Sequence, residues 1–491
     1  MVMNLNADPT ILNPILSGDY NAAFVSSFIF ETLIEYDNET LLYKPLLAES
    51  WDVSGDHKQF TFHLRKGVHW QDGQPFTAND VVYSFNAIMD PKVDAAGSRV
   101  SLRDVEKVEA PDDNTVRFTY ARPYFRALLV CGTMPIVPKH IFGAAVDFNK
   151  DPHNRMPVGT GPYIFKEWKT KQKVVLEKNP KYWGGEAGIN SLVFRIIEDS
   201  AVAFQELKKG EIDFSEISPI KWERSTDTKV FEEKFNKVQY YLPSFSFIGW
   251  NMRRPFFGDK RVRHAMTMMI NKKDILAKLL FGHGVIVEGD QYYFGDAYDK
   301  SIVSDPFDPE KAAQLLDEAG WTDHDGDGIR DKDGLPFKFD FYSTSSNFAT
   351  QLGSILREEL LKVGVVVNLR PLEFNALIRA VSERDFDAVM MGWALPLDND
   401  TYMVWHSSEG DKGSNFVGFA NPEADKILDK VRVEFDRNRR NELFRALQKI
   451  LHDEQPYTFL FNQATLLAYS KRFTNVKVYK TGVDIKEWKV K

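Results

Sequence analysis

The sequence has little cysteine, no excess of positive charge and no long apolar run. Cys131 is the single cysteine among 491 residues, which excludes an internal disulfide framework and a CxxC redox site. Lysine and arginine number 62 against 70 aspartates and glutamates, and the resulting net charge of -8 argues against nucleic acid and against an anionic membrane surface. No stretch approaches the roughly 18 consecutive apolar residues of a membrane-spanning helix.

Motifs of the common catalytic and nucleotide-binding sites are also missing. The chain contains no GxSxG, no GxxxxGK[ST] and no HExxH. Gly159-Thr-Gly161 begins like a dinucleotide-binding loop, but Ile164 stands where the third glycine would be and Pro162 removes an amide donor. We therefore expect no enzyme and no cofactor.

The start of the chain leaves the compartment open. Residues 1–9 show neither the basic nor the apolar part of a secretory leader. A cytoplasmic protein would begin in this way, and so would a mature secreted protein whose leader is absent from the sequence. The single cysteine does not decide between them, because a chain of this length buries enough apolar surface to fold without disulfides.

The pattern of apolar residues changes near the middle of the chain. In the first half, Phe60, Phe62 and Leu64 alternate with polar residues, as do residues 115–120, and both patterns predict half-buried strands. The second half predicts an α/β arrangement with the following elements: helices at 309–319, 352–363, 373–383, 421–434 and 437–452, and strands at 365–369, 386–393 and 457–461.

One acidic stretch is typical of a calcium-binding loop. Asp323, Asp325 and Asp327 occupy the first, third and fifth positions of an EF-hand-like pattern, and Gly328 occupies the sixth. The twelfth position, a bidentate glutamate in an EF-hand, is Gly334 here, although Asp331 adds a carboxylate at the ninth. We predict either a structural Ca²⁺ site or a solvated turn of aspartates and glycines.

The segment 392–406 directly follows a predicted strand and carries several residues suited to ligand binding. Ligands of α/β proteins gather beyond the carboxyl ends of strands. Gly392 permits close approach of a ligand, Trp393 and Trp405 offer stacking faces, and Asp398 and Asp400 accept hydrogen bonds or bind a cation. The alternative is structural, with both tryptophans in the core and the aspartates capping a helix near Thr401.

A series of motifs along the chain resembles the family-5 extracytoplasmic solute-binding proteins, the oligopeptide-, dipeptide- and nickel-binding components of ABC importers. The motifs are, in order, LLAESWDVSGD (46–56), FTFHLRKGVHW (60–70), DGQPFTANDVVY (72–83), VGTGPY (158–163), NPKYW (179–183), KGEID (209–213), Asn251-Met252, DKRVRHA (259–265), FDPEKA (307–312) and DEAGW (317–321). They extend over essentially the whole sequence.

The resemblance implies an α/β fold: a two-lobed, hinge-closing periplasmic binding protein of the large class with an extra N-terminal α+β subdomain. The first lobe would be discontinuous and comprise residues 1–34, 161–245 and 462–491, with the extra subdomain at 35–160. Residues 252–455 would form the second α/β lobe, and 246–251 and 456–461 the hinge crossings.

The resemblance also implies a function. The chain would be the substrate-binding receptor of an ABC importer that captures a short peptide between two closing lobes and delivers it to a membrane permease. It would be a monomer, periplasmic or tethered outside the membrane. Peptide-binding relatives often carry an aspartate three residues after the motif tryptophan, but this position is Pro396, so Asp398 would have to serve as the amine anchor from a shifted loop.

Other ligands and roles remain open at this point. An oligosaccharide could stack on Trp393 and Trp405, and a metal chelate could lie near His406. A glycosidase that uses Asp398 and Asp400 fits poorly, because residues two apart on a strand lie on one side and would not flank a sugar bond. The predicted ligand-binding set is completed by Tyr402, by Asn251 in its motif, and by Tyr20, where relatives supply a loop to the binding cleft.

Overall fold

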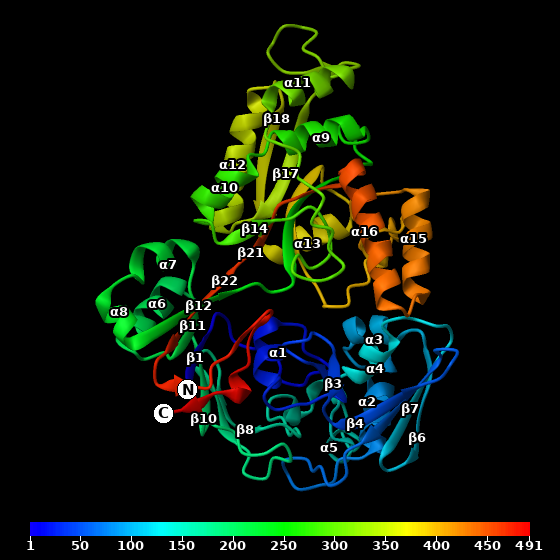
Figure 1. The fold of residues 1–491 in the computed structure, drawn as a ribbon, viewed down its shortest axis with the longest axis vertical. Helices are drawn as coiled ribbons and strands as arrows, with labels where there is room; N and C mark the ends of the chain where they lie inside the picture. Colours follow the sequence, from blue (N-terminus) through cyan, green and yellow to red (C-terminus); the bar gives the residue numbers. More distant parts are fainter. The chain divides into compact units, whose positions relative to one another are not determined.

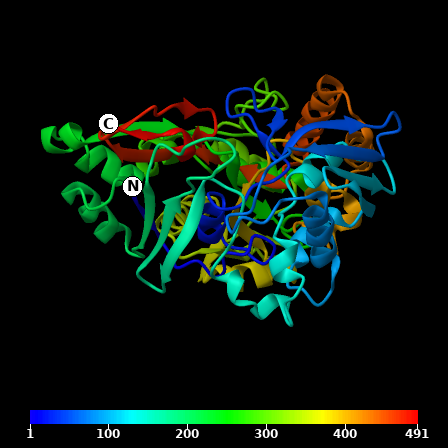
Figure 2. The ribbon, with the colours of Figure 1, turned by 90° about the horizontal axis from the view of Figure 1, so that it is seen from below.

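The computed structural model describes residues 1–491, which divide into two units (Figure 1). The first unit contains Met1–Tyr240 and Leu466–Lys491, and the second contains Tyr241–Thr465. Both termini therefore belong to the first unit, and they lie near each other in Figure 1 and in Figure 2. The second unit is a continuous insertion between two parts of the first.

A mixed sheet of seven strands organises the first unit. Its strands, in spatial order, are β12 (Phe235–Tyr240), β22 (Thr465–Ser470), β11 (Phe214–Glu216), β1 (Val2–Leu5), β10 (Ser191–Ile196), β9 (Lys173–Lys178) and β8 (Tyr163–Lys169). The helices associated with this part are α1 (Tyr20–Ser26), α6 (Ser200–Lys209), α7 (Pro219–Ser225) and α8 (Lys229–Lys234). Phe28, Tyr163 and Phe194 pack in the core of this part. Strand β22, which comes from late in the sequence, is one of the seven strands of this sheet.

A second sheet and a second hydrophobic core of the first unit lie mainly within residues 33–142, and Ile15 also belongs to this core. The sheet has the order β4 (Ala48–Val53), β5 (Gln59–Leu64), β7 (Thr115–Tyr120) and β6 (Val105–Asp112). The other elements of this part are the hairpin of β2 (Ile34–Tyr36) and β3 (Tyr43–Pro45) and the helices α2 (Ala78–Met89), α3 (Ala96–Leu102), α4 (Ala127–Gly132) and α5 (Lys139–Phe142).

The alternation in the sequence matches the burial of these strands. Phe60, Phe62 and Leu64 of β5 are buried, and so are Val116, Phe118 and Tyr120 of β7. Cys131 is buried in the same core, and burial raises the pKa of its thiol well above the usual range. The cysteine is therefore a neutral core residue.

A five-stranded sheet organises the second unit. Its order is β18 (Val366–Leu372), β17 (Lys338–Thr344), β19 (Ala388–Ala394), β13 (Ser244–Trp250) and β20 (Tyr457–Phe459), with β14 (Gly284–Ile286) paired to β21 (Phe461–Gln463) beside it. The helices are α9 (Lys260–Met268), α10 (Lys272–Leu279), α11 (Pro309–Glu318), α12 (Asn347–Leu361), α13 (Phe374–Ser382), α14 (Tyr402–Trp405), α15 (Pro422–Val433) and α16 (Arg437–Glu454). The predicted helix–strand–helix–strand order is confirmed by α12, β18, α13 and β19.

Both faces of this sheet are buried against helices. Successive residues of a strand point to opposite faces, so one strand contributes side chains to both cores. Ile248 and Trp250 of β13 contribute to one core, together with residues of α9, α11 and α12. Phe245 and Phe247 of the same strand contribute to a second core, together with residues of α13 to α16. In Figure 1, α15 and α16 run side by side. The fold is α/β, as predicted.

The segments predicted to cross between the lobes lie within the second unit. Residues 246–251 fall in β13 and its end, and 456–461 fall in β20 and β21. The chain enters this unit after Tyr240 and leaves it after Thr465. The first lobe was predicted to end at residue 245 and to resume at 462, with the second lobe at 252–455. These boundaries differ by several residues from those of the two units, because β13 is hydrogen-bonded to both β19 and β20 and stays in their sheet.

Candidate functional site

The carboxyl-terminal half of β19 leads into residues 392–406, which we call the tryptophan segment. Strand β19 pairs with β13 along its whole length, from Ala388 to Ala394. On its other edge, only Ala388 and Val389 pair with β17. Residues 390–394 therefore have one strand edge without a partner strand, and such an edge is able to accept an extended peptide.

Gly392 and Trp393 lie on this half of β19 and differ in what they contact. Gly392 is exposed, and a side chain at this position would meet the carbonyl oxygen of Phe245 at 3.2 Å. The Trp393 ring is half-buried and lies parallel to the ring of Phe416, with a centroid distance of 6.1 Å. The guanidinium of Arg384 lies 5.2 Å from the centre of the Phe416 ring and extends the stack.

Asp398 and Asp400 each face an arginine from a different helix. Arg440 of α16 lies 4.0 Å from the Asp398 carboxylate, and Arg432 of α15 lies 3.3 Å from the Asp400 carboxylate. Asp400 also accepts a hydrogen bond of 3.1 Å from the backbone N–H of Tyr402. Each carboxylate thus faces its own arginine, whereas the paired acids of a glycosidase act together on one sugar bond.

Tyr402, the first residue of α14, and His406, the residue after its last, form a stacked pair. Their ring centroids lie 4.2 Å apart at an interplanar angle of 15°, and Arg432 lies 4.7 Å from the centre of the Tyr402 ring. His406 Nδ1 is 2.7 Å from the Ser408 hydroxyl, and Nε2 faces Asp425 and Asp429 at 4.0 and 3.8 Å. This histidine is therefore placed among acidic residues of α15.

Trp405 is a core residue in the structure, in contrast to its predicted stacking on a ligand. Its side chain is 0% exposed, and it packs against Phe419, Tyr457 and Phe459. Its indole Nε1 donates a hydrogen bond of 2.7 Å to the carboxylate of Asp290, which is itself buried. Burial raises the pKa of Asp290, and the hydrogen bond from Trp405 opposes that rise.

Asn251 also has a structural role. It is buried, and its side-chain amide donates hydrogen bonds to the backbone carbonyls of Arg384 and Phe386 at 3.3 and 2.8 Å. Its side-chain oxygen accepts a hydrogen bond from the backbone N–H of Arg253 at 3.2 Å. These bonds join the end of β13 to the start of β19 and differ from the predicted ligand contact.

Tyr20, the remaining predicted ligand-binding residue, lies in the first unit. It is the first residue of α1, its side chain is 70% exposed, and its ring is parallel to that of Phe24 at 6.3 Å. An exposed aromatic ring of this kind is available to a ligand.

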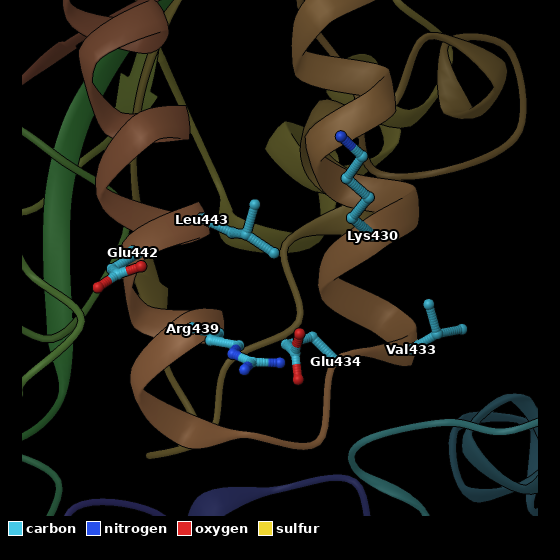
Figure 3. A pocket seen from close by; sticks show the side chains of 6 residues that line it. All are labelled: Lys430, Val433, Glu434, Arg439, Glu442 and Leu443. Atoms are coloured by element: carbon cyan, nitrogen blue, oxygen red, sulfur yellow. The ribbon is translucent and has the colours of Figure 1, made fainter.

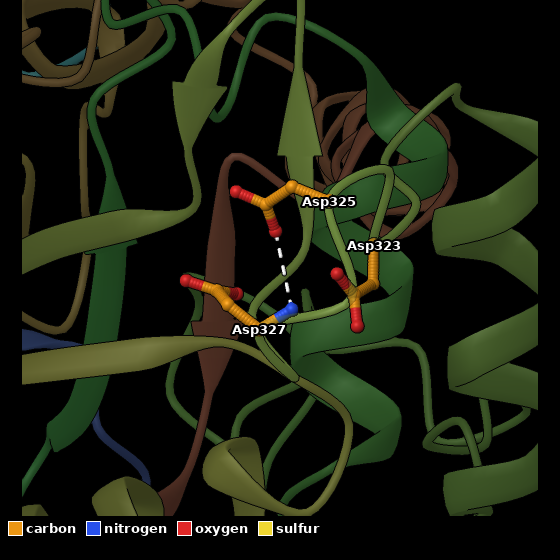
Figure 4. Close-up of side chains that lie close together, drawn as sticks. All are labelled: Asp323, Asp325 and Asp327. Atoms are coloured by element: carbon orange, nitrogen blue, oxygen red, sulfur yellow. Dashed lines mark hydrogen bonds between the residues drawn. The ribbon is translucent and has the colours of Figure 1, made fainter.

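The four predicted metal ligands do not all converge in the loop 323–331, which we call the aspartate loop. Oxygens of Asp323, Asp325 and Asp327 lie within 4.8 Å of one another, and all three side chains are exposed (Figure 4). Each also accepts a backbone hydrogen bond within the loop; Asp325, for example, accepts from the N–H of Asp327 at 3.1 Å. Asp331 instead faces His324, 3.0 Å from Nδ1.

A hollow of about 430 Å³ lies beside the junction of α15 and α16. Figure 3 shows Arg439 and Glu434 near each other at the turn, with Lys430 and Val433 on α15. None of its lining residues was predicted to bind ligand.

Sequence reasoning did not find Asp290, Arg432, Arg440 or Phe416, which contact the tryptophan segment. No motif marks them, since each belongs to a stretch with an ordinary helical or loop pattern. They reach the segment only through the tertiary fold.

Comparison with known proteins identifies the family. Residues 43–415 match the family described as "Bacterial extracellular solute-binding proteins, family 5 Middle". The chain belongs to this family. The predicted recognition is confirmed.

Relatives of this family-5 chain cover its full length. The oligopeptide-binding protein AppA of Bacillus subtilis is 31% identical over 99% of this chain and 91% of its own. The structure of AppA with a nonapeptide has a TM-score of 0.85 at 29% identity and covers 100% of this chain and 98% of the other. The structure of NikZ from Campylobacter jejuni with Ni(L-His) has a TM-score of 0.84 at 27% identity and covers 100% of this chain and 99% of the other.

None of the helices of this chain combines the length and apolar character that a membrane span requires.

Proposed function

We propose that this chain is the substrate-binding receptor of an ABC importer, that its ligand is a short peptide, and that it delivers the peptide to a membrane permease. The unpartnered edge of β19 at residues 390–394 carries the proposal. The similarity to oligopeptide-binding AppA along the whole chain supports it. The protein returns its ligand unchanged and is not an enzyme. It acts outside the cytoplasmic membrane as a monomer, tethered or periplasmic.

The peptide backbone pairs with β19 as an added strand. Main-chain hydrogen bonds of this kind give affinity that is independent of side-chain identity. Gly392 has no side chain to obstruct the incoming strand, and Trp393 offers an aromatic surface at its end. The same set of contacts therefore accepts peptides of different sequence.

The peptide amine is the group for which Asp398 was predicted as an anchor. Its carboxylate lies 4.0 Å from Arg440, so an incoming ammonium competes with an existing cation. An Asp398→Ala variant tests this role against free and N-acetylated peptides. If the variant and the wild type prefer the free amine equally, Asp398 is not the anchor.

Native mass spectrometry and thermal shift against pools of peptides, oligosaccharides and Ni(L-His) test the ligand class. A peptide receptor gains melting temperature with peptide concentration, because a ligand of the native state stabilises it, and it releases the peptide intact. Stabilisation by an oligosaccharide or by the nickel chelate alone would overturn the peptide proposal. Turnover of any component would overturn the receptor proposal.

Trp393→Ala tests the location of the site. We expect peptide affinity to fall about tenfold, in line with the loss of an aromatic contact. Trp51→Ala is the matched control, because Trp51 is also half-buried but lies on β4. Equal peptide affinity in the two variants would place the site elsewhere.

Lobe closure, which the family resemblance implies, remains a prediction; small-angle scattering with and without peptide tests it.

A further inference from the structure

A pocket of about 760 Å³ lies in the second unit. It is lined by residues of three stretches, namely 270–273, 286–288 and 293–307. None of the predicted ligand-binding residues is among them. Its volume is within the range of pockets that hold small organic molecules, about 300–1,000 Å³.

An ion pair lies in the wall of this pocket and is internally neutral. The Lys272 ammonium, at the start of α10, is hydrogen-bonded to the Glu288 carboxylate, and both side chains are buried. Burial alone would raise the pKa of Glu288, but the charge of Lys272 and the hydrogen bonds from Lys272, His452 and Ser304 together outweigh burial and keep the pKa below its usual value. Glu288 is also fixed by its backbone, because its N–H donates to the Tyr298 hydroxyl at 2.6 Å.

The second carboxylate on the wall is also paired. Asp305 lies 2.6 Å from Nδ1 of His264, whose Nε2 is 2.9 Å from the carbonyl oxygen of Asp453. The acidic groups of the pocket are thus engaged with cations or hydrogen-bond donors of the protein. Neither carboxylate is available as the main anchor of a cationic ligand.

Two lysines of the pocket have no carboxylate partner. Lys273 is exposed and forms no ion pair, and Lys300 contacts only aromatic rings, 5.0 Å from the centre of Tyr293 and 5.8 Å from that of Phe294. The pocket therefore presents two uncompensated positive charges. An anion would gain two charge-assisted contacts here without breaking an existing ion pair.

The rest of the lining is largely apolar. Ile270, Ile286 and Ile302 lie in the walls. Val303 and Phe307 are 77% and 38% exposed, which leaves apolar surface open to solvent beside the lysines. An apolar ligand body would remove this surface from water, which favours binding.

We propose that this pocket is a second ligand site, which binds a small organic anion with a carboxylate and an apolar body. The carboxylate pairs with Lys273 and Lys300, and the body packs against Ile302, Val303 and Phe307. The two proposed sites share no residue. A ligand bound in this pocket contacts both the start of α10 and the loop that precedes α11.

Phenylacetate, phenethyl alcohol and phenethylamine are suitable probes, since they combine a phenyl ring with a negative, a neutral and a positive group. We expect isothermal titration to give the order phenylacetate, then the alcohol, then the amine, from tight to weak. The double variant Lys273→Ala/Lys300→Ala should lower phenylacetate affinity about tenfold, because two charge-assisted contacts are lost. Lys338→Ala/Lys412→Ala is the control, since it removes two exposed lysines of the same unit outside the pocket.

Three results would overturn the proposal: no binding of phenylacetate, binding of the amine that is as tight as that of the anion, or an equal loss of affinity in the two double variants. Ser304→Trp, which fills the pocket with a large side chain, provides a second variant and should abolish binding. Phenylacetate affinity should be the same in wild type and in Trp393→Ala. A failure of this site is therefore distinguishable from a failure of the proposed peptide function.

Discussion

The tryptophan segment and the aspartate loop both carry aspartates, but their carboxylates have different surroundings. In the tryptophan segment, Asp400 is nearly buried and faces Arg432, and the neighbouring Trp405 binds the buried Asp290. In the aspartate loop, the three clustered aspartates are exposed, and they accept hydrogen bonds from the loop backbone. The carboxylates of the first region face arginines from distant parts of the chain, whereas those of the second accept hydrogen bonds from their own turn.

This difference determines how much each region contributes to stability. A buried charge requires partners because desolvation is costly, so the removal of one partner has a large effect. An exposed carboxylate is solvated in the folded and in the unfolded state, so its removal changes little. Substitutions in the two regions should therefore differ in size.

The largest effect should follow from Trp405→Ala. It removes a fully buried indole and leaves Asp290 without its hydrogen-bond donor. We expect a loss of about 3–5 kcal/mol in the free energy of unfolding, measured by urea denaturation. Trp393→Ala is the control and should cost clearly less, because its ring is only half-buried. Similar losses in both variants would contradict the distinction between core and site tryptophans.

Arg432→Met should have the next largest effect. It removes the charge that faces Asp400, and we expect a loss of about 1–3 kcal/mol. Arg370→Met is the control; it breaks the more exposed pair with Asp340 and should cost at most about 1 kcal/mol. The double variant Arg432→Met/Asp400→Asn should recover part of the loss. A double variant no more stable than Arg432→Met would show that the charge pair is not the cause.

Asp290→Asn should change how stability depends on pH. The folded pKa of Asp290 is raised by burial, so the folded protein holds the proton more tightly than the unfolded chain, whose value is about 3.9. The contribution of Asp290 is therefore complete below about pH 4 and is lost as the pH rises through the folded pKa. Each unit of elevation corresponds to about 1.4 kcal/mol.

The amide variant keeps an oxygen that accepts from Trp405 but does not ionise. We expect its stability relative to wild type to increase with pH, measured by urea denaturation from about pH 4 to about pH 8. Parallel pH profiles of variant and wild type would show that Asp290 does not titrate in this range.

Substitutions in the aspartate loop should have the smallest effect. Asp323 accepts hydrogen bonds from the N–H groups of Gly326 and Gly328, and Asp323→Ala should cost less than about 1 kcal/mol. The calcium prediction is tested in the same pair of proteins. Because Asp331 faces His324 and Gly334 supplies no carboxylate, we expect only slight stabilisation of wild type by Ca²⁺ and none of the variant. A large calcium-dependent rise in the melting temperature of the wild type would contradict the view that the aspartate loop contributes less to stability than the tryptophan segment.

Local patterns in the sequence were sufficient to predict most elements of the second unit. Leu352, Leu356 and Leu360 lie one helical turn apart, and all three are buried on the inner face of α12. The predicted helix at 373–383 is Phe374–Ser382 in the structure. Periodicity succeeds here because burial of one face is what makes these segments regular.

The site was less predictable because identical residue types have different surroundings. Trp393 and Trp405 both lie in the tryptophan segment, but the first ends a strand and the second is on a helical turn that packs into the core. The arginines that face Asp398 and Asp400 come from α16 and α15, and no local pattern connects them. Asn251 was predicted to bind ligand because it lies in a motif, but its side chain instead joins the ends of two strands by hydrogen bonds.

The position of β22 has a consequence for the order in which the protein forms. This strand is inserted between β11 and β12, although both of those strands are synthesised long before it. The central sheet of the first unit therefore stays incomplete until β22 has left the ribosome, whereas the second unit is continuous and requires nothing beyond Thr465. The unit that begins first is completed last, so a truncation just after Thr465 would leave a gap in the first sheet and spare the second.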